Sequence, residues 1–192
     1  DGDETINLFD LDADGDGVSD ITELVQETNP ADSSDNPSGL PSMVFGEVLV
    51  DSDWTTVELN KTFQYPVVVA GPLSLNDQAP AVVRIRNVTS NGFEIRLQEY
   101  EYQDGQHAQE KASFLVMEMG SYYLPDGTQI EALYFEAEAN YPSFDSVSFI
   151  SQFAVQPMVM TSIGTFNDQG SVTGRMARVS TSGFDYSLHK EE

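Results

Sequence analysis

The chain has 192 residues, 40% of them hydrophobic, and a formal net charge of −24, which allows one or two domains with a substantial core. The strong negative charge argues against nucleic acid or an anionic membrane surface as a partner, because both require a basic footprint on the protein. The absence of cysteine excludes disulfides and cysteine nucleophiles, and no apolar run is long enough to predict membrane insertion.

Acidic residues are unevenly distributed along the chain. Residues 1–60 contain 16 Asp and Glu and no Lys or Arg, whereas residues 61–192 contain the other 16 acidic residues and all eight basic ones. This division indicates an acidic metal-binding segment attached to a more ordinary domain. Because the chain opens at "DGDET", within an acidic pattern and without Met, we expect it to be a piece of a longer protein.

The first predicted element is a calcium-binding loop in "DLDADGDGVSDITE", residues 10–23, whose spacing fits D-x-[DN]-x-[DN]-G-x5-E. Ca²⁺ takes about 6–8 oxygen ligands, and carboxylates two residues apart in a tight loop converge on one ion. Gly17 permits the turn, and a short helix is expected to begin at Ser19. The predicted ligands are Asp12, Asp14, Asp16, Val18 through its carbonyl, Asp20 and Glu23. The alternative is a solvated acidic linker.

The flanks of this loop differ from those of an EF-hand, because no helical pattern precedes it. Residues 1–32 instead resemble the bacterial form of thrombospondin type 3 repeats, D-x-D-G-D-G-x-x-D-x-x-E. The resemblance implies an extracellular spacer made rigid by Ca²⁺, in which Asp1 and Asp3 end an upstream repeat and Asp10 shares an ion with its neighbours. The Pro/Ser/Gly-rich stretch "NPADSSDNPSG" then separates this segment, residues 1–36, from the next domain.

From about residue 43 the chain consists of short β-like runs separated by turn residues, without helical periodicity. The pattern predicts an all-β fold, a sandwich or a barrel. The expected strands are residues 43–50, 55–63, 66–72, 81–89, 92–102, 112–119, 130–139, 146–150, 157–166, 172–180 and 183–190.

The β region contains an internal repeat. Aligned positions lie 90 and then 91 residues apart, as in Trp54/Phe144, Val57/Val147, Phe63/Phe153, Pro66/Pro157, Arg84/Arg175 and Gly92/Gly183. We predict two antiparallel sandwich domains, residues 37–120 and 121–192, of which the second is short by one strand. Either the protein continues, or the second copy ends in a disordered loop, or another chain supplies the strand, because a sheet without it exposes an unpaired edge.

The repeat unit resembles the H-type lectin domain. The resemblance rests on "F-x-x-P-V-V-V-x-G-x-x-S-L-N" (63–76), "R-I-R-N-V-T-S-N-G-F-E-I" (84–95) and "LQEYEY" (97–102). It implies a six-stranded antiparallel sandwich, usually trimeric, that binds N-acetylgalactosamine or related sugars. The family's arginine position falls near Pro80 or Ala81, its aromatic position on Tyr100 and its histidine position on Glu101, so the family's own binding mode is incomplete here.

A sugar site is also predicted from the residues themselves. If Phe93, Ile95 and Leu97 point inward, alternation along the strand places the next side chains outward, where tyrosine faces can stack on sugar rings and polar groups of the following loop, among them Gln106 and Glu110, can bind hydroxyls. The predicted carbohydrate-binding residues are Tyr100, Tyr102, Asp104, His107 and Arg96. The alternative is an ordinary strand followed by a polar loop. Arg84 and Arg86 are expected to pair with Glu94 or Glu99, or to face a subunit partner.

No enzyme motif is evident, since the chain has only two histidines and no G-x-S-x-G. The sequence therefore predicts a secreted, non-catalytic, lectin-like region of a larger bacterial protein, with Ca²⁺ as its cofactor, a polysaccharide or glycan as its partner and a homo-oligomer, a trimer by resemblance, as its assembly. The alternative is a structural or adhesive surface module that binds proteins or itself.

Overall fold

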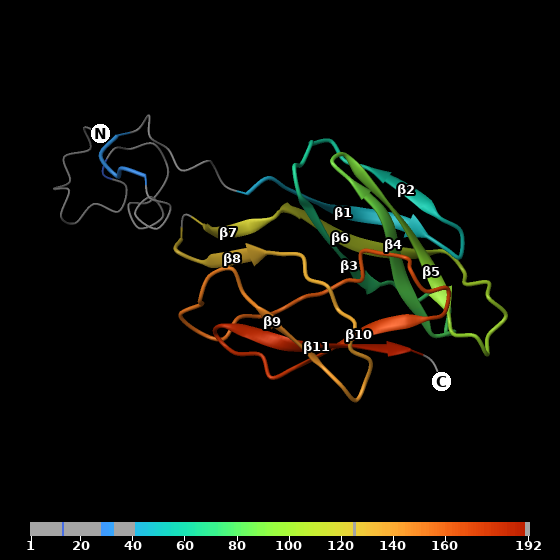
Figure 1. The fold of residues 1–192 in the computed structure, drawn as a ribbon. Coiled ribbons are helices and arrows are strands. Elements are labelled where there is room, and N and C mark those ends of the chain that lie inside the picture. The colour runs from blue at the N-terminus through green and yellow to red at the C-terminus, as the bar shows by residue number, and fades with distance from the viewer. Residues whose placement is uncertain (1–12, 14–27, 33–40, 125, 191–192) are drawn as a thin grey trace. The chain divides into compact units, whose positions relative to one another are not determined.

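The computed structural model describes residue 13 and residues 28–32, 41–124 and 126–190. All the regular secondary structure in this part of the chain is β-strand (Figure 1). Neighbouring strands in the three-stranded sheets are antiparallel. The expectation of an all-β fold is therefore confirmed for these residues. The predicted calcium ligands, from Asp1 to Glu23, and the short helix after Ser19 lie outside the described residues.

The chain divides into two compact units, one of residues 1–42 and 120–131 and the other of residues 43–119 and 132–192. The first unit contains strand β7 (Gly120–Tyr123), which pairs with β8 (Gln129–Ala132). A turn joins them, in which the amide of Gly127 donates to the carbonyl of Leu124 at 2.8 Å. All further elements belong to the second unit.

The first repeat forms a sandwich of two three-stranded antiparallel sheets. One sheet has the order β1-β6-β3 and consists of β1 (Met43–Val50), β6 (Glu110–Glu118) and β3 (Pro66–Leu73). The other has the order β2-β5-β4 and consists of β2 (Thr55–Glu58), β5 (Gly92–Glu99) and β4 (Ala81–Thr89).

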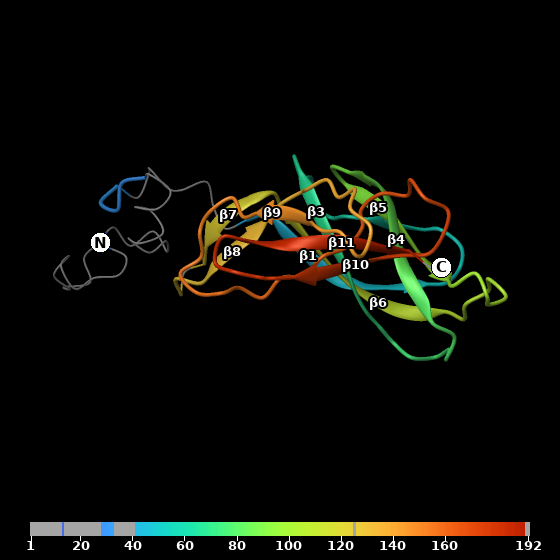
Figure 2. The same ribbon diagram turned by 60° about the horizontal axis from the view of Figure 1, so that its bottom comes forward.

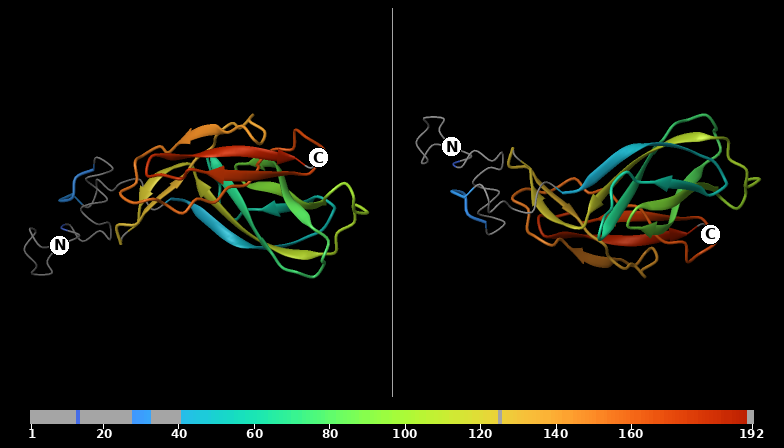
Figure 3. Two further views of the ribbon diagram at one scale, coloured as in Figure 1. Left: turned by 90° about the horizontal axis from the view of Figure 1, so that it is seen from below. Right: turned by 90° about the horizontal axis from the view of Figure 1, so that it is seen from above.

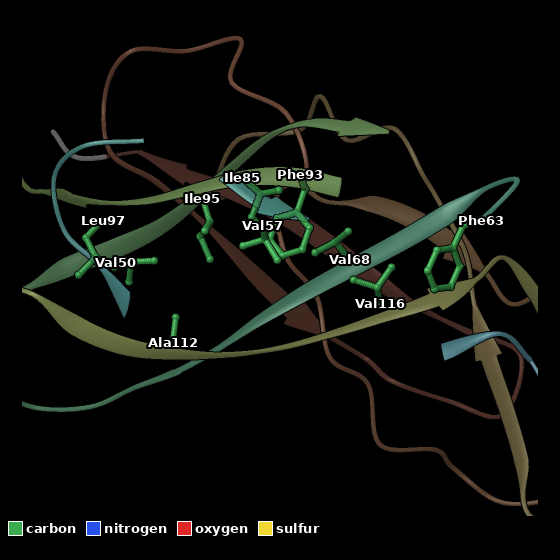
Figure 4. Packing of buried hydrophobic residues seen from close by; sticks show 10 residues of the cluster. All are labelled: Val50, Val57, Phe63, Val68, Ile85, Phe93, Ile95, Leu97, Ala112 and Val116. Atoms are coloured by element: carbon green, nitrogen blue, oxygen red, sulfur yellow. The ribbon is translucent and has the colours of Figure 1, made fainter. Parts of the chain in front are cut away.

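The core of the first repeat lies between these two sheets. Alternation of buried residues along β5 supplies Phe93, Ile95 and Leu97, as the sequence pattern predicts. Figure 4 shows side chains of both sheets pointing toward one another. The buried cluster consists of Val50, Val57, Phe63, Val68, Ile85, Phe93, Ile95, Leu97, Ala112 and Val116.

Three strands of the second repeat reproduce one sheet of the first. They are β9 (Asp145–Ser148), β10 (Val172–Ala177) and β11 (Gly183–Lys190), in the order β10-β11-β9. The pairing of Gly183 with Ser148 repeats that of Gly92 with Glu58. The three strands lie together in the views of Figures 2 and 3. The order and register of β10-β11-β9 therefore match those of β4-β5-β2 in the first repeat.

A backbone irregularity recurs at the same position of both repeats. Asn87 and Arg178 lie 91 residues apart, and their φ angles are +50° and +48°. In the first repeat the ladder between β4 and β5 shifts register between Arg86 and Thr89, so Asn87 lies within a β-bulge. Because non-glycine residues seldom adopt positive φ, this shared conformation is strong evidence that the two copies have the same local fold.

The rest of the second repeat differs from the first. Segments 133–139 and 157–164 correspond to β1 and β3, but neither is a strand in the described part of the chain. They still contact the second core: Leu133, Phe135 and Ala137 from one segment, and Val159 from the other, pack against buried Phe184 and its neighbours. The described residues thus give the second repeat one three-stranded sheet and two core-lining segments that are not strands.

No helix among the residues that the structure describes has the length and apolar character needed to cross a membrane.

Candidate functional site

The loop of residues 100–109 joins β5 to β6 and carries four of the five residues predicted to bind carbohydrate. Its two ends lie on inward positions of their strands, because Glu99 ends β5 and Glu110 begins β6 and both side chains are buried. The loop is therefore attached to the core by two carboxylates rather than by apolar residues.

His107 lies between these carboxylates and is 7% exposed. Its Nδ1 is 3.3 Å from Glu99 Oε1, and its Nε2 is 3.7 Å from Glu110 Oε1. The backbone of the loop is also held: the amide of Gly105 donates to Glu99 Oε2 at 2.9 Å, and the amide of His107 donates to Ser52 Oγ, outside this cluster, at 2.7 Å. The buried His107 side chain thus holds the loop from beneath.

Glu110 accepts hydrogen bonds from a second loop, residues 74–79. The donors are the hydroxyl of Ser74 at 2.5 Å and the amides of Asn76 at 2.7 Å and Asp77 at 2.8 Å. The hydrogen bond from Ser74 is the main cause that lowers the pKa of Glu110, and the two amides act in the same direction, whereas burial opposes them. Glu110 is therefore held as a carboxylate.

Three groups of this cluster have the donor types of a metal site. Ligand atoms of Asp77, Glu99 and His107 lie within 4.8 Å of one another. A nitrogen and two oxygens suit a transition metal such as Zn²⁺ better than Ca²⁺, which prefers oxygen alone. However, the carboxylate of Asp77 already accepts the amides of Ala79 at 2.9 Å and Ala108 at 3.1 Å. These hydrogen bonds explain the cluster as an anchor that holds the loops of residues 74–79 and 100–109 in place.

The lowered pKa of Glu110 predicts an acid-dependent loss of stability. The ionised side chain stabilises the fold fully above the pKa of an unfolded Glu, about 4.3, and this contribution is lost as the pH falls through the lower pKa of the folded state. Glu110→Gln should therefore melt at a lower temperature than the parent protein at pH 7, and the difference should shrink below about pH 4.

Circular dichroism melts between pH 7 and pH 3 measure this effect. The control is Glu47→Gln, whose side chain is 61% exposed and pairs with Lys111 at 3.3 Å; an exposed pair contributes little. A difference between Glu110→Gln and the parent that stays constant with pH would contradict the assignment.

The two predicted tyrosines lie side by side at the start of the loop. The rings of Tyr100 and Tyr102 are parallel, with an interplanar angle of 1° and centroids 6.0 Å apart. Tyr102 is 70% exposed, and Tyr100 is partly buried. The amide of Gln103 donates to the carbonyl of Tyr100 at 3.0 Å, and Asp104, also exposed, accepts the amide of Gln106 at 2.9 Å. The loop thus presents an aromatic pair beside polar groups.

Arg96 lies in a different environment, an arginine–aromatic layer between the two repeats. Its guanidinium is 4.8 Å from the ring centroid of Trp54 and 5.0 Å from that of Phe166, and these two rings meet edge to face at 5.3 Å. Trp54 belongs to the first repeat and Phe166 to the second. Arg96 is therefore part of the contact between repeats, and the structure does not place it with the tyrosine pair.

Arg84 is the buried centre of this layer. It donates to the carbonyls of Asp168 at 2.8 Å and Gly170 at 2.5 Å, and its guanidinium lies 4.6 Å from the centroid of Phe166. Burial is the main cause that lowers its pKa. Arg86 forms the expected ion pair with Glu94, and its guanidinium lies 3.9 Å from the centroid of Trp54. In place of the expected carboxylate of β5, Arg84 donates to Gln98 Oε1 of that strand at 2.9 Å and to the loop of the second repeat.

Sequence reasoning left the inward orientation of Glu99 and the buried position of His107 unrecognised. The signal for Glu99 was present, because the alternation that directs Phe93, Ile95 and Leu97 inward also directs Glu99 inward. No local pattern indicates that the loop folds His107 back beneath itself, since this depends on the side chain of Glu110 and on Ser52, which is 55 residues away.

Comparison with known proteins gives one resemblance that covers most of the chain. The chain is 32% identical over 180 residues to Halomucin of Haloquadratum walsbyi, an alignment that includes 88% of this chain and 2% of that protein. The chain thus spans only about one fiftieth of the curated relative that it matches. No protein-family profile and no solved structure matches it. The resemblances to thrombospondin type 3 repeats and H-type lectins therefore remain predictions.

Proposed function

We propose that this chain is a non-catalytic carbohydrate-binding region of a larger secreted or cell-surface protein. The observation that carries the proposal is the parallel pair of Tyr100 and Tyr102, of which Tyr102 is 70% exposed. Aromatic faces of this kind stack on the apolar faces of sugar rings, and the hydroxyls at their edges bind polar groups. The buried His107 cluster supports the proposal because a loop held in one conformation loses little entropy on binding.

The arrangement favours one sugar ring on the outer face of Tyr102. The tyrosine centroids are 6.0 Å apart, and a ring between them would need van der Waals contact, about 3.5–4 Å, on both sides. Asp104 is exposed on the same loop and provides an acceptor for hydroxyls. Single sites of this size bind weakly, so useful retention on a polymer requires several linked sites.

Replacing Tyr102 with alanine is expected to abolish retention on the bound glycan, because the exposed stacking face is lost. A glycan array first identifies a ligand, and affinity electrophoresis in the corresponding polysaccharide then measures retention. Tyr100→Ala should reduce retention less, since Tyr100 is partly buried and supports the other ring. Tyr141→Ala is the control, because Tyr141 is 62% exposed and lies in the second repeat. Equal retention of Tyr102→Ala and the parent protein would reject this site.

We also propose that residues 1–36 form a calcium-stiffened spacer, on the basis of the spacing from Asp12 to Glu23. Calorimetric titration with Ca²⁺ is expected to show binding that Asp14→Asn together with Asp16→Asn weakens at least tenfold, because each change removes a charged ligand. Glycan retention should not depend on these substitutions if the sugar site is in the tyrosine loop. No heat of Ca²⁺ binding at millimolar concentration would reject the spacer.

A second candidate function, a structural or adhesive module, is supported by the arginine–aromatic layer. Trp54, Arg84 and Arg96 use the outer face of a sheet to bind the neighbouring repeat, which is the behaviour of a repeat array rather than of a ligand site. Absence of any retained glycan, together with concentration-dependent self-association in analytical ultracentrifugation, would favour this second function.

A further inference from the structure

Two N-x-S/T sequences without proline at the middle position occur in the chain, "NKT" at residues 60–62 and "NVT" at residues 87–89. This pattern is the acceptor for N-glycosylation, in which the asparagine side chain receives the sugar and the hydroxyl two residues later is needed for recognition. So short a pattern also arises by chance. Exposure, side-chain contacts and backbone conformation therefore decide which asparagine a transferase can reach in the folded protein.

The first acceptor lies in the loop between β2 and β3. Asn60, Lys61 and Thr62 are all exposed. The side chains of Asn60 and Thr62 form no hydrogen bond with the residues that the structure describes. The amide nitrogen of one and the hydroxyl of the other are therefore both available to an enzyme.

Backbone hydrogen bonds hold this loop at both of its ends. The amide of Leu59 donates to the carbonyl of Asn91 at 2.8 Å, and the amide of Phe63 donates to the carbonyl of Ser90 at 2.7 Å. Phe63 is 2% exposed and fixes the end of the loop in the core. The acceptor is thus presented at the surface between two fixed points.

The second repeat has the same loop without the acceptor. Phe149 and Phe153 donate in the same way, at 3.0 Å and 2.8 Å, to the carbonyls of residues 182 and 181. The residues between them read "ISQ", with Ile150 in the place of Asn60. The loop geometry therefore requires neither asparagine nor threonine and does not explain the acceptor sequence in the first repeat.

The acceptor at residues 87–89 differs because both of its essential side chains are engaged. Asn87 Nδ2 donates to Glu94 Oε2 at 3.1 Å, and the hydroxyl of Thr89 donates to the carbonyl of Gly92 at 3.0 Å. Asn87 also lies in the β-bulge between β4 and β5, with a φ of +50°. A transferase could bind Asn87 only after these contacts and part of the sheet had opened.

We propose that Asn60 is a site of N-linked glycosylation in the folded protein and that Asn87 is not. The inference goes beyond carbohydrate binding and rests only on the secreted or cell-surface location in the proposed function. The donor is an oligosaccharide joined through C1 of its first sugar to a polyprenyl phosphate or diphosphate. Nδ2 of Asn60 forms a bond to this C1, and the bond from C1 to the phosphate oxygen breaks. The lipid phosphate leaves with the electron pair, and the proton lost from Nδ2 passes to a base of the transferase.

The glycan would be attached at the opposite end of β5 from the predicted sugar site. Strand β5 begins at Gly92, which pairs with Glu58, two residues before Asn60. It ends at Glu99, directly before the loop of residues 100–109. A strand of this length spans about 24 Å. A glycan on Asn60 should therefore leave retention on a polysaccharide unchanged.

The test treats the folded 192-residue chain with a purified single-subunit oligosaccharyltransferase that accepts N-x-S/T, and with a lipid-linked oligosaccharide as donor. We expect the intact mass to rise by one glycan per chain, and fragmentation to place that glycan on Asn60. Thr62→Ala should lose the modification although it keeps the asparagine, whereas Thr62→Ser should retain it. Asn87→Gln should be modified to the same extent as the parent protein.

Two capped peptides separate the effect of the fold from that of the sequence. Residues 57–65 and residues 84–92 contain the two acceptors without their tertiary contacts, and both peptides should be modified. The initial rate at Asn87 should fall at least about tenfold from the peptide to the folded chain, because modification there waits for local opening. The rate at Asn60 should fall much less.

An Asn60 that stays unmodified in the folded chain overturns the proposal, whether or not its peptide is modified. Equal modification of Asn60 and Asn87 in the folded chain overturns the selection between them. A chain that receives a glycan on Asn60 but is retained on no polysaccharide supports this proposal and rejects carbohydrate binding, so the two failures are distinguishable.

Discussion

Replacing Phe93 with alanine should lower the free energy of unfolding by about 3–5 kcal/mol, the range for large aromatic residues in a packed core. Phe93 is 1% exposed and meets Phe114 edge to face at 5.4 Å, so the substitution leaves a cavity between the two sheets. Urea denaturation followed by circular dichroism measures the loss, and the fluorescence of Trp54, the sole tryptophan, reports on the outer face of the same sheet.

Phe184, the counterpart of Phe93 in the second repeat, provides the matched comparison. It is 5% exposed and contacts Phe135 at 5.6 Å and Phe149 at 5.7 Å between centroids. Those two neighbours are only partly buried, so they can collapse into the space that Phe184→Ala leaves. We therefore expect a loss of about 1–3 kcal/mol, smaller than for Phe93→Ala, because the penalty depends on how far the site relaxes. Equal losses would mean that the second core is as enclosed as the first.

Arg84→Ala should destabilise the contact between the repeats by about 3 kcal/mol, because two carbonyl acceptors lose a charged donor. The same substitution removes the guanidinium from the ring of Phe166, 4.6 Å away. Arg84→Lys should recover little of the loss, since an ammonium cannot reproduce the planar fork that reaches Asp168 and Gly170 together. Trp54 fluorescence and urea denaturation measure both variants.

Arg175→Ala is the control for this prediction. Arg175 occupies the position of Arg84 in the second repeat, 91 residues later, but its side chain is exposed. Exposed substitutions usually change stability by less than about 0.5 kcal/mol. A similar loss in Arg84→Ala and Arg175→Ala would show that the contact with the second repeat contributes nothing to the effect.

Strand positions were predictable because they depend on local alternation. The spacing between Gly92 and Gly183 locates β5 and β11, and the apolar residues Phe93 and Phe184 that follow them are both buried. A repeat in sequence implies a repeat in register, and the pairings of β11 with β9 and of β5 with β2 agree with that inference. The predicted domain boundaries and the calcium segment remain predictions.

The candidate sites were less predictable because they depend on contacts between distant residues. Tyr100 and Tyr102 are two residues apart, so alternation predicts them on one face, and their rings do stack, although both lie in the loop after β5. Alternation also predicts Arg96 on that face, but the structure places Arg96 against Phe166, 70 residues later, and not with the tyrosine pair. No local pattern predicts this contact.

The arginine–aromatic layer gives the pair of repeats a polarity. The first repeat contributes the outer face of a sheet, and the second contributes the loop that carries Phe166. The equivalent loop of the first repeat exposes Leu75 at 82% in the place of Phe166, and the equivalent face of the second presents Arg175. A contact between unlike surfaces propagates in one direction instead of closing on itself. Repeats added by the same operation would extend head to tail, each stabilised by its immediate neighbours.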